Sequence, residues 1–256
     1  YKVCCIGGSS NYSIKTTTPN EWLNGKLLQK ARQEMLDSSI SNKRILEKHC
    51  YRCINQEKNY GNSDRKHHVK NILENIKHGD RSILDQVLLF NPKQDYEIKN
   101  RCLILQARIF GNQCNLDCYM CQPGASSTRE LMFKKINNRK FIQSWDVSGA
   151  DMNIKKNSTI LKQLVDLAPY IHTFLLQGGE PFVMKNQFEF IEELVKSGHS
   201  KHITLEMNSN LTVLGTTKYN ILDYVNKFKQ LNISASLDGF GKYNDYIRRR
   251  SKWDVV

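Results

Sequence analysis

The sequence lacks the long apolar run that a membrane-spanning helix needs. No window of the 256 residues approaches about 18 consecutive apolar side chains, and no charged and then apolar signal segment opens the chain. These absences favour a soluble globular protein with no membrane partner. The chain opens with Tyr1 rather than Met and stops at Val256, at the start of an expected element, so we expect both natural ends to be missing.

An arginine-rich arm and a basic run with interleaved aromatic residues are also absent. The formal net charge is +13, which is a common feature of proteins that bind nucleic acid. However, residues 1–100 carry 17 basic and 11 acidic side chains, and residues 101–256 carry 21 and 14. The positive charge is spread over the chain rather than gathered, so nucleic acid stays open as a partner but is not favoured.

Cysteine is more plentiful, and its eight copies are grouped. Cys4 and Cys5 are adjacent, Cys50 and Cys53 are separated by two residues, three more lie close together near the middle, and Cys102 stands alone. Grouped thiols in a long chain favour metal binding over a disulfide scaffold, and they favour a reducing interior. We therefore expect a cytoplasmic protein.

The densest group is Cys114-Asn-Leu-Asp-Cys118-Tyr-Met-Cys121, which follows a strand-like apolar run over residues 102–110. Three thiolates at this spacing on a loop can converge on one face of a small inorganic cluster. They are one short of the four ligands that 4Fe-4S clusters and structural zinc usually take. The trio therefore indicates a metal centre with one open position.

A second motif follows the apolar run over residues 171–176. It reads Gln177-Gly178-Gly179-Glu180-Pro181. Two glycines at a strand end permit close approach of the backbone to a ligand and a positive φ, and the carboxylate beside them can pair with an ammonium group. Taken alone, the same residues also suit a plain strand-to-helix turn.

A CxxxCxxC loop followed by a Gly-Gly-Glu strand end resembles the radical S-adenosylmethionine (SAM) enzymes. In that family the three cysteines hold a 4Fe-4S cluster whose open iron binds SAM, and the Gly-Gly-Glu segment holds the amino group of SAM. The resemblance therefore implies that the cluster is held by Cys114, Cys118 and Cys121. It also implies that SAM is bound by Gly178, Gly179, Glu180 and Pro181.

Two later strand ends extend this resemblance. Asn210 follows the expected strand over residues 203–207, and Ser236 ends the expected strand over residues 232–237, before Tyr246-Ile-Arg248. The resemblance implies that Asn210 lies in the SAM site and that Ser236 and Arg248 contact the SAM carboxylate. One departure is Met120, which stands where many members have an aromatic residue.

The N-terminal segment is similar to the start of SPASM/twitch radical SAM proteins. It combines adjacent cysteines, an expected helix over residues 20–37, and the series Cys50-x-x-Cys53, Glu57 and Ser63-x-Arg65. This resemblance implies an auxiliary iron-sulfur cluster held by Cys5, Cys50 and Cys53. A zinc knuckle or reduced core thiols remain the alternatives.

The order of expected elements predicts an α/β fold. The four expected strands alternate with helices expected over residues 126–136, 158–167, 187–197 and 218–229. This alternation predicts a parallel sheet covered by helices, with ligands at the carboxyl ends of the strands. The resemblance implies a partial TIM-type barrel that is truncated at its C-terminus and preceded by a small, mostly helical region containing cysteines.

We accordingly expect three parts: a Cys-containing twitch-like region over residues 1–66, a helical connector over residues 67–99 with a helix at 67–90, and a radical SAM core over residues 100–256. The resemblance implies an enzyme that cleaves SAM reductively to a 5′-deoxyadenosyl radical for hydrogen abstraction, with no catalytic residue beyond the cluster ligands. It further implies a one-electron donor such as flavodoxin or ferredoxin, and a peptide or protein substrate. The alternative is a non-catalytic zinc- or iron-sulfur-binding module that contacts nucleic acid through a basic surface.

Overall fold

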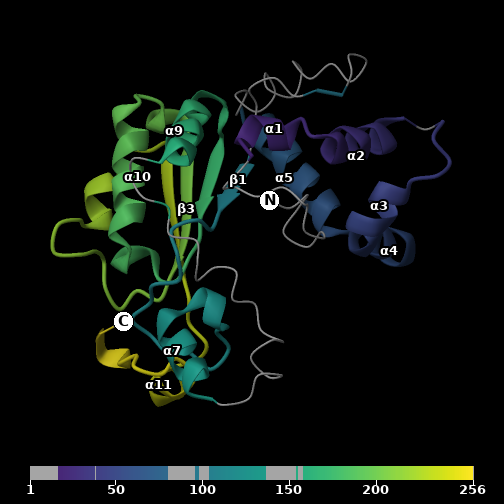
Figure 1. Ribbon diagram of the computed structural model, residues 1–256. Helices are drawn as coiled ribbons and strands as arrows, with labels where there is room; N and C mark the ends of the chain where they lie inside the picture. Colours follow the sequence, from purple (N-terminus) through teal and green to yellow (C-terminus); the bar gives the residue numbers. More distant parts are fainter. Residues whose placement is uncertain are drawn as a thin grey trace. The chain divides into compact units, whose positions relative to one another are not determined.

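The computed structural model describes residues 17–37, 39–79, 96–97, 104–136, 154 and 158–255. The chain divides into two compact units, residues 1–103 and residues 104–256 (Figure 1). Cys4, Cys5, Cys102 and the expected helical stretch over residues 81–90 lie outside the described residues. None of the described helices is long and apolar enough to cross a membrane.

The described part of the first unit contains five helices: α1 (Pro19–Leu23), α2 (Lys26–Leu36), α3 (Arg44–His49), α4 (Tyr51–Tyr60) and α5 (Asp64–Lys77). Thr18 starts α1 through a capping box with Glu21, in which each side chain accepts a hydrogen bond from the other residue's backbone amide. The single helix expected over residues 20–37 is wrong. Gly25 has extended backbone angles, so the first helix ends before it, with Asn24 as its C-cap, and a separate helix, α2, begins after it.

Two polar side chains fix the next helices. Glu34 of α2 is buried, and its carboxylate accepts hydrogen bonds from the amides of Ile45 (2.9 Å) and Leu46 (3.0 Å) in the first turn of α3. Ser63 caps α5 by accepting from the Lys66 amide, so this helix begins before the expected residue 67.

The second unit is built on a four-stranded sheet, and the predicted parallel sheet is confirmed. Its strands are β1 (Ile104–Ala107), β2 (Thr173–Leu176), β3 (Thr204–Ser209) and β4 (Gln230–Ala235), in that spatial order. Neighbouring strands are parallel and aligned, with Ala107 opposite Leu176 and Leu176 opposite Met207. The carboxyl ends of the first three strands therefore lie at the same edge of the sheet.

The helices of this unit are α7 (Ser127–Lys135), α9 (Thr159–Asp166), α10 (Lys185–Lys196) and α11 (Lys242–Ile247). Short 3-10 helices lie between them: η1 (Pro123–Ala125), η2 (Ala168–Tyr170), η3 (Pro181–Val183), η4 (Ser200–His202), η5 (Ile221–Tyr224) and η6 (Trp253–Val255). Ser126 and Ser158 cap α7 and α9. In Figure 1, α9 and α10 lie along the sheet, whereas α7 and α11 lie together beyond one end of it.

The core of the second unit is aromatic. Phe174 of β2 and Phe190 of α10 are fully buried, with ring centroids 5.2 Å apart, and Phe110 after β1 lies 5.5 Å from Phe190. These contacts hold α10 on the sheet and fix the start of the loop that follows β1.

The helix expected over residues 218–229 is wrong. A bridge between Gly215 and Asn220 keeps the chain in a turn, and only η5 follows it. The Lys229 amide already donates to the Ile203 carbonyl, so the chain has joined the sheet by residue 229. Too few residues remain between the turn and the sheet for a long helix.

Candidate functional site

The cysteine trio lies on the loop between β1 and α7. Cys118 is buried, Cys114 and Cys121 are half-buried, and all three are free thiols. The loop is fixed by its own neighbours: the Cys121 amide donates to the Cys118 carbonyl, and the Cys114 amide donates to Ser127 Oγ. The trio is therefore presented by an ordered loop.

The three thiols have different acidities. Burial raises the pKa of Cys114 to about 11. The pKa of Cys118 is raised chiefly by its hydrogen bond with Cys121, and burial is the second cause. The same hydrogen bond lowers the pKa of Cys121 to about 7. Because the thiolate is the form that binds metal, thiols of this kind lose their protons as a metal binds.

Three guanidinium groups add positive charge around these sulfurs. Arg108, Arg129 and Arg248 each lower the pKa of Cys121. Arg248 Nη1 lies 3.9 Å from Cys118 Sγ, and Arg129 Nε donates to the Cys121 carbonyl at 3.3 Å. Sequence reasoning found Arg248 but missed the other two. The only signal for Arg108 was a charge inside an otherwise apolar strand run.

The Gly-Gly-Glu turn packs against the start of the cysteine loop. A Cβ at Gly179 would lie 2.0 Å from the Gln113 carbonyl oxygen, and the Glu180 amide donates to that same oxygen at 2.8 Å. The expectation of a positive φ here is wrong, because neither Gly178 nor Gly179 has one. The glycines are needed for close approach to the chain's own backbone.

Glu180 is buried at the centre of this arrangement. Its carboxylate accepts hydrogen bonds from Ser209 Oγ (2.7 Å), the Asn210 amide (2.8 Å) and the Phe182 amide (3.3 Å). Burial raises the pKa of Glu180, although these hydrogen bonds and the positive charge of Arg248 oppose the shift. Pro181, also buried, begins η3 directly after it.

Of the remaining predicted residues, Asn210 and Ser236 directly follow β3 and β4, and Arg248 follows α11. Asn210 Nδ2 donates to Asn115 Oδ1 on the cysteine loop at 2.9 Å. The Ser236 amide donates to the Ser209 carbonyl at 2.7 Å, and Arg248 pairs with Asp238 at 2.7 Å. The structure therefore brings the trio, Glu180, Asn210 and Arg248 into one network.

Cys50 and Cys53 belong to the first unit, whereas the network described above belongs to the second. Cys50 joins α3 to α4, Cys53 lies in the first turn of α4, and both are half-buried cysteines outside any disulfide. Both raise the pKa of Arg65, although its hydrogen bond to Glu57 is the larger cause. Cys5 lies outside the described residues.

Comparison with known families decides the class of this site. Residues 109–256 match the radical SAM superfamily, so the match includes the trio, the Gly-Gly-Glu turn and the last three strands. The chain belongs to the radical SAM superfamily. No curated protein matches it. As a superfamily member it is a SAM-dependent iron-sulfur enzyme, and the family implies a 4Fe-4S cluster and SAM as cofactors.

The donor set of the trio, three cysteines on one loop, fits a 4Fe-4S cluster of the radical SAM kind. In the part of the chain that the structure describes, no three His, Cys, Asp or Glu side chains are placed to hold a single metal ion. In a 4Fe-4S cluster each cysteine binds its own iron, so the sulfurs need not meet at one point. The guanidinium groups around the trio also suit a centre whose thiolate ligands are negatively charged.

The glycine turn gives a first prediction. Gly179→Ala should force the loop before Cys114 to move, because backbone oxygen atoms of Gln113 (2.0 Å) and Asn112 (2.5 Å) block the new Cβ. Gly178→Ala is the matched control, because its Cβ would mainly meet the flexible end of Met184 at 2.5 Å. We expect Gly179→Ala to lower the melting temperature more and to make the metal-free trio react faster with a thiol reagent. Equal effects of the two variants would contradict this assignment.

Proposed function

We propose that Cys114, Cys118 and Cys121 bind the 4Fe-4S cluster and that SAM binds beside them at the strand ends. The observation that supports this best is the contact between the two motifs. Gln113 directly precedes Cys114 of the trio, and its carbonyl accepts a hydrogen bond from the Glu180 amide at 2.8 Å. A ligand of the trio and a ligand of Glu180 would therefore occupy one site.

The charges of the site suit the two ends of an amino acid. Glu180 supplies a buried carboxylate for an ammonium group, and Arg248 supplies a guanidinium group for a carboxylate. We propose that Ser236 assists Arg248 and that Asn210 keeps β3 joined to the cysteine loop. Gly178, Gly179 and Pro181 shape the turn that presents Glu180.

The bound cofactors supply one-electron reductive cleavage of SAM for hydrogen abstraction from a substrate. The chain's own residues bind and orient these cofactors. Glu180 is held by three hydrogen bonds before any ligand arrives, so little reorganisation is needed on binding. Cys118 and Glu180 are almost fully buried, which keeps water away from this part of the site.

We propose further that the substrate is a peptide or protein, that a flavodoxin or ferredoxin supplies the electron, and that the protein works in the cytoplasm. The N-terminal resemblance to SPASM/twitch proteins supports a peptide or protein substrate. The grouping of the cysteines, none of which forms a disulfide among the described residues, supports the cytoplasmic location. The division into a twitch-like region (1–66), a connector (67–99) and a core (100–256) is part of this proposal.

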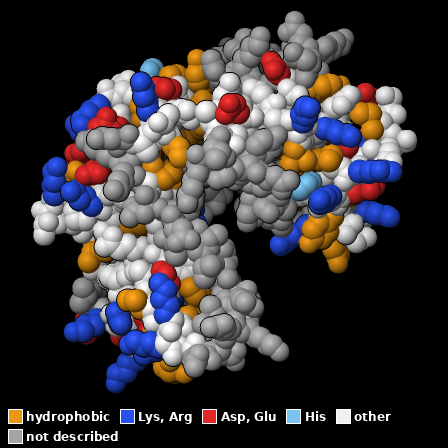
Figure 2. All heavy atoms as spheres, viewed as in Figure 1, with side chains coloured by type: hydrophobic (Ala, Val, Ile, Leu, Met, Phe, Trp, Pro, Cys, Tyr) orange, Lys and Arg blue, Asp and Glu red, His pale blue; other side chains and the backbone are white. Residues whose placement is uncertain are grey.

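In the face drawn in Figure 2, Lys and Arg side chains are dispersed, which gives no support to a nucleic-acid surface there.

The cluster assignment is tested by Cys118→Ser after anaerobic reconstitution with iron and sulfide. We expect the variant to lose the 4Fe-4S absorption and the dithionite-dependent release of 5′-deoxyadenosine, while far-ultraviolet circular dichroism stays unchanged. Cys102→Ala, which removes a thiol outside the trio, is the control and should keep both. Recovery of tetrahedral zinc without iron in the anaerobic wild-type protein would overturn the assignment.

The ammonium site is tested by Glu180→Gln. Losing a charge-assisted hydrogen bond should weaken SAM binding by about 1.5 to 3 kcal/mol, or about ten- to a hundredfold, with the cluster retained. Ser209→Ala is the matched control, because it removes one hydrogen bond to Glu180 but keeps the charge. Calorimetric titration of SAM into both reconstituted variants measures the difference. Equal affinities in the two variants would mean that Glu180 only supports the fold.

The auxiliary cluster is a separate proposal. Its support is local: Cys50 and Cys53 lie near Arg65, which Glu57 holds through a hydrogen bond from Nε at 3.0 Å and an ion pair at 2.5 Å. A guanidinium group held in this way would place positive charge beside a cluster with negatively charged ligands. Cys50→Ala/Cys53→Ala should lower the iron content of the reconstituted protein to four per chain from a higher value, as measured by iron and sulfide analysis. An unchanged iron content in the double variant would exclude the auxiliary cluster.

A further inference from the structure

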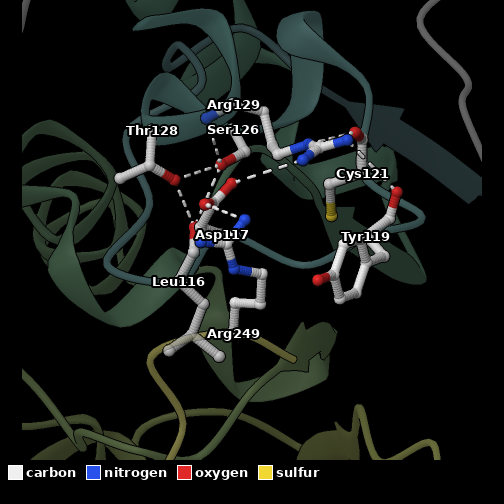
Figure 3. A network of polar contacts seen from close by, with 8 residues as sticks. All are labelled: Leu116, Asp117, Tyr119, Cys121, Ser126, Thr128, Arg129 and Arg249. Atoms are coloured by element: carbon white, nitrogen blue, oxygen red, sulfur yellow. Dashed lines mark hydrogen bonds and ion pairs between the residues drawn. The ribbon is translucent and has the colours of Figure 1, made fainter. Parts of the chain in front are cut away.

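An aspartate that is not a metal ligand lies inside the cysteine loop. Asp117 precedes Cys118, and its side chain is only 3% exposed. Its carboxylate lies 3.7 Å from Arg129 on α7 and 3.7 Å from Arg249 after α11. Figure 3 shows the two guanidinium groups directed at this carboxylate from different elements. A buried carboxylate between two arginines is costly to leave unpaired, so these three side chains depend on one another.

The last residues of α11 and those that follow it also meet the cysteine loop through their backbone. The Asp117 amide donates to the Arg249 carbonyl and the Tyr119 amide donates to the Ile247 carbonyl, both at 3.0 Å. The Arg249 guanidinium group lies 5.6 Å from the centre of the Tyr119 ring, and Tyr246 packs on that ring at 5.5 Å. Residues 246–249 therefore form a strap along the loop.

Arg129 binds the other side of the same loop. It donates to the carbonyls of Cys121 (3.3 Å) and Tyr119 (3.4 Å), and its side chain is 11% exposed. Ser126 and Thr128 at the start of α7 both donate to the Leu116 carbonyl (Figure 3). Asp117 is thus the point at which α7, the cysteine loop and the strap meet.

Hydrogen bonds alone do not account for this carboxylate. Among the described residues, Asp117 Oδ1 has no hydrogen-bond partner, and the contacts of both carboxylate oxygens with arginine are at ion-pair distance. Its role is therefore chiefly one of charge. It compensates Arg129, one of the guanidinium groups that lie around the trio, and Arg249 of the strap.

We infer that Asp117 is a positioning residue that clamps the cysteine loop between α7 and the strap and makes the bound cluster harder to reduce. The second part rests on the proposed function. Reduction adds a negative charge to the cluster, and neighbouring positive charge stabilises the reduced form. By compensating Arg129, which lies beside Cys121, and Arg249 of the strap, Asp117 lowers the reduction potential.

The clamp is tested on the metal-free protein by hydrogen exchange. In Asp117→Asn, the ion pairs are lost and the strap should open more often, so peptides covering residues 114–121 and 246–250 should exchange faster. Peptides of β2 and β3 should keep their wild-type rates. Unchanged exchange in the two named peptides, or equal acceleration in the sheet, would overturn the clamp.

The charge role is tested by a double-variant cycle on the reconstituted protein. Asp117→Asn should raise the cluster's reduction potential, and Arg249→Gln, at a side chain that is 44% exposed, should lower it. A tenfold change in the equilibrium constant for reduction corresponds to about 59 mV for a one-electron couple, and we expect about this size for each. The double variant should return toward the wild-type potential, although its strap should exchange as fast as in the single variants.

Redox titration followed by electron paramagnetic resonance measures these potentials. Asp223→Asn, which removes an exposed carboxylate on η5, is the charge control and should leave the potential unchanged. Shifts of the same sign in the two single variants would show a packing effect and overturn the charge role. If the wild-type protein takes up no 4Fe-4S cluster, the proposed function fails and the redox role fails with it, whereas hydrogen exchange still decides the clamp.

Discussion

The site depends on one close backbone contact, that of Gly179 against Gln113. The parallel register aligns the ends of β1 and β2, and the absence of a side chain at Gly179 lets the second strand end touch the loop that leaves the first. The Glu180 amide then bonds to Gln113, and the carboxylate of Glu180 bonds to the end of β3. Three strand ends are joined in this way through one glutamate.

Charge is the second constraint on the same site. Three arginines lie around Cys121, one of them also beside Cys118, and two carboxylates, Asp117 and Asp238, pair with members of this group. The result is a site with positive charge close to the thiolates and with that charge partly compensated at its edges. Such a balance suits a centre that must hold anionic ligands and still accept an electron.

Sequence alone predicted the alternation of strands and helices and the segments that carry a motif. The four strands, their parallel order, the trio and the Gly-Gly-Glu turn all follow from local patterns, and the family match includes the last two. The helix expected over residues 218–229 failed because the pairing of Lys229 with Ile203 is a long-range contact with no local signal. Arg108, Arg129 and Asp117 were missed for a related reason, because their positions near the sulfurs depend on how distant elements pack.

The strap has a consequence for how the protein is made. Arg248 and Cys118, which it brings together, are 130 positions apart in the sequence. Contacts of such long range form late, after the intervening strands and helices have closed the chain between them. The cysteine loop is therefore completed only when almost the whole second unit has left the ribosome and folded. Until that point the three thiols have Arg108 and Arg129 near them in the sequence but lack Arg248, so the positive charge around them is complete only when the strap is in place.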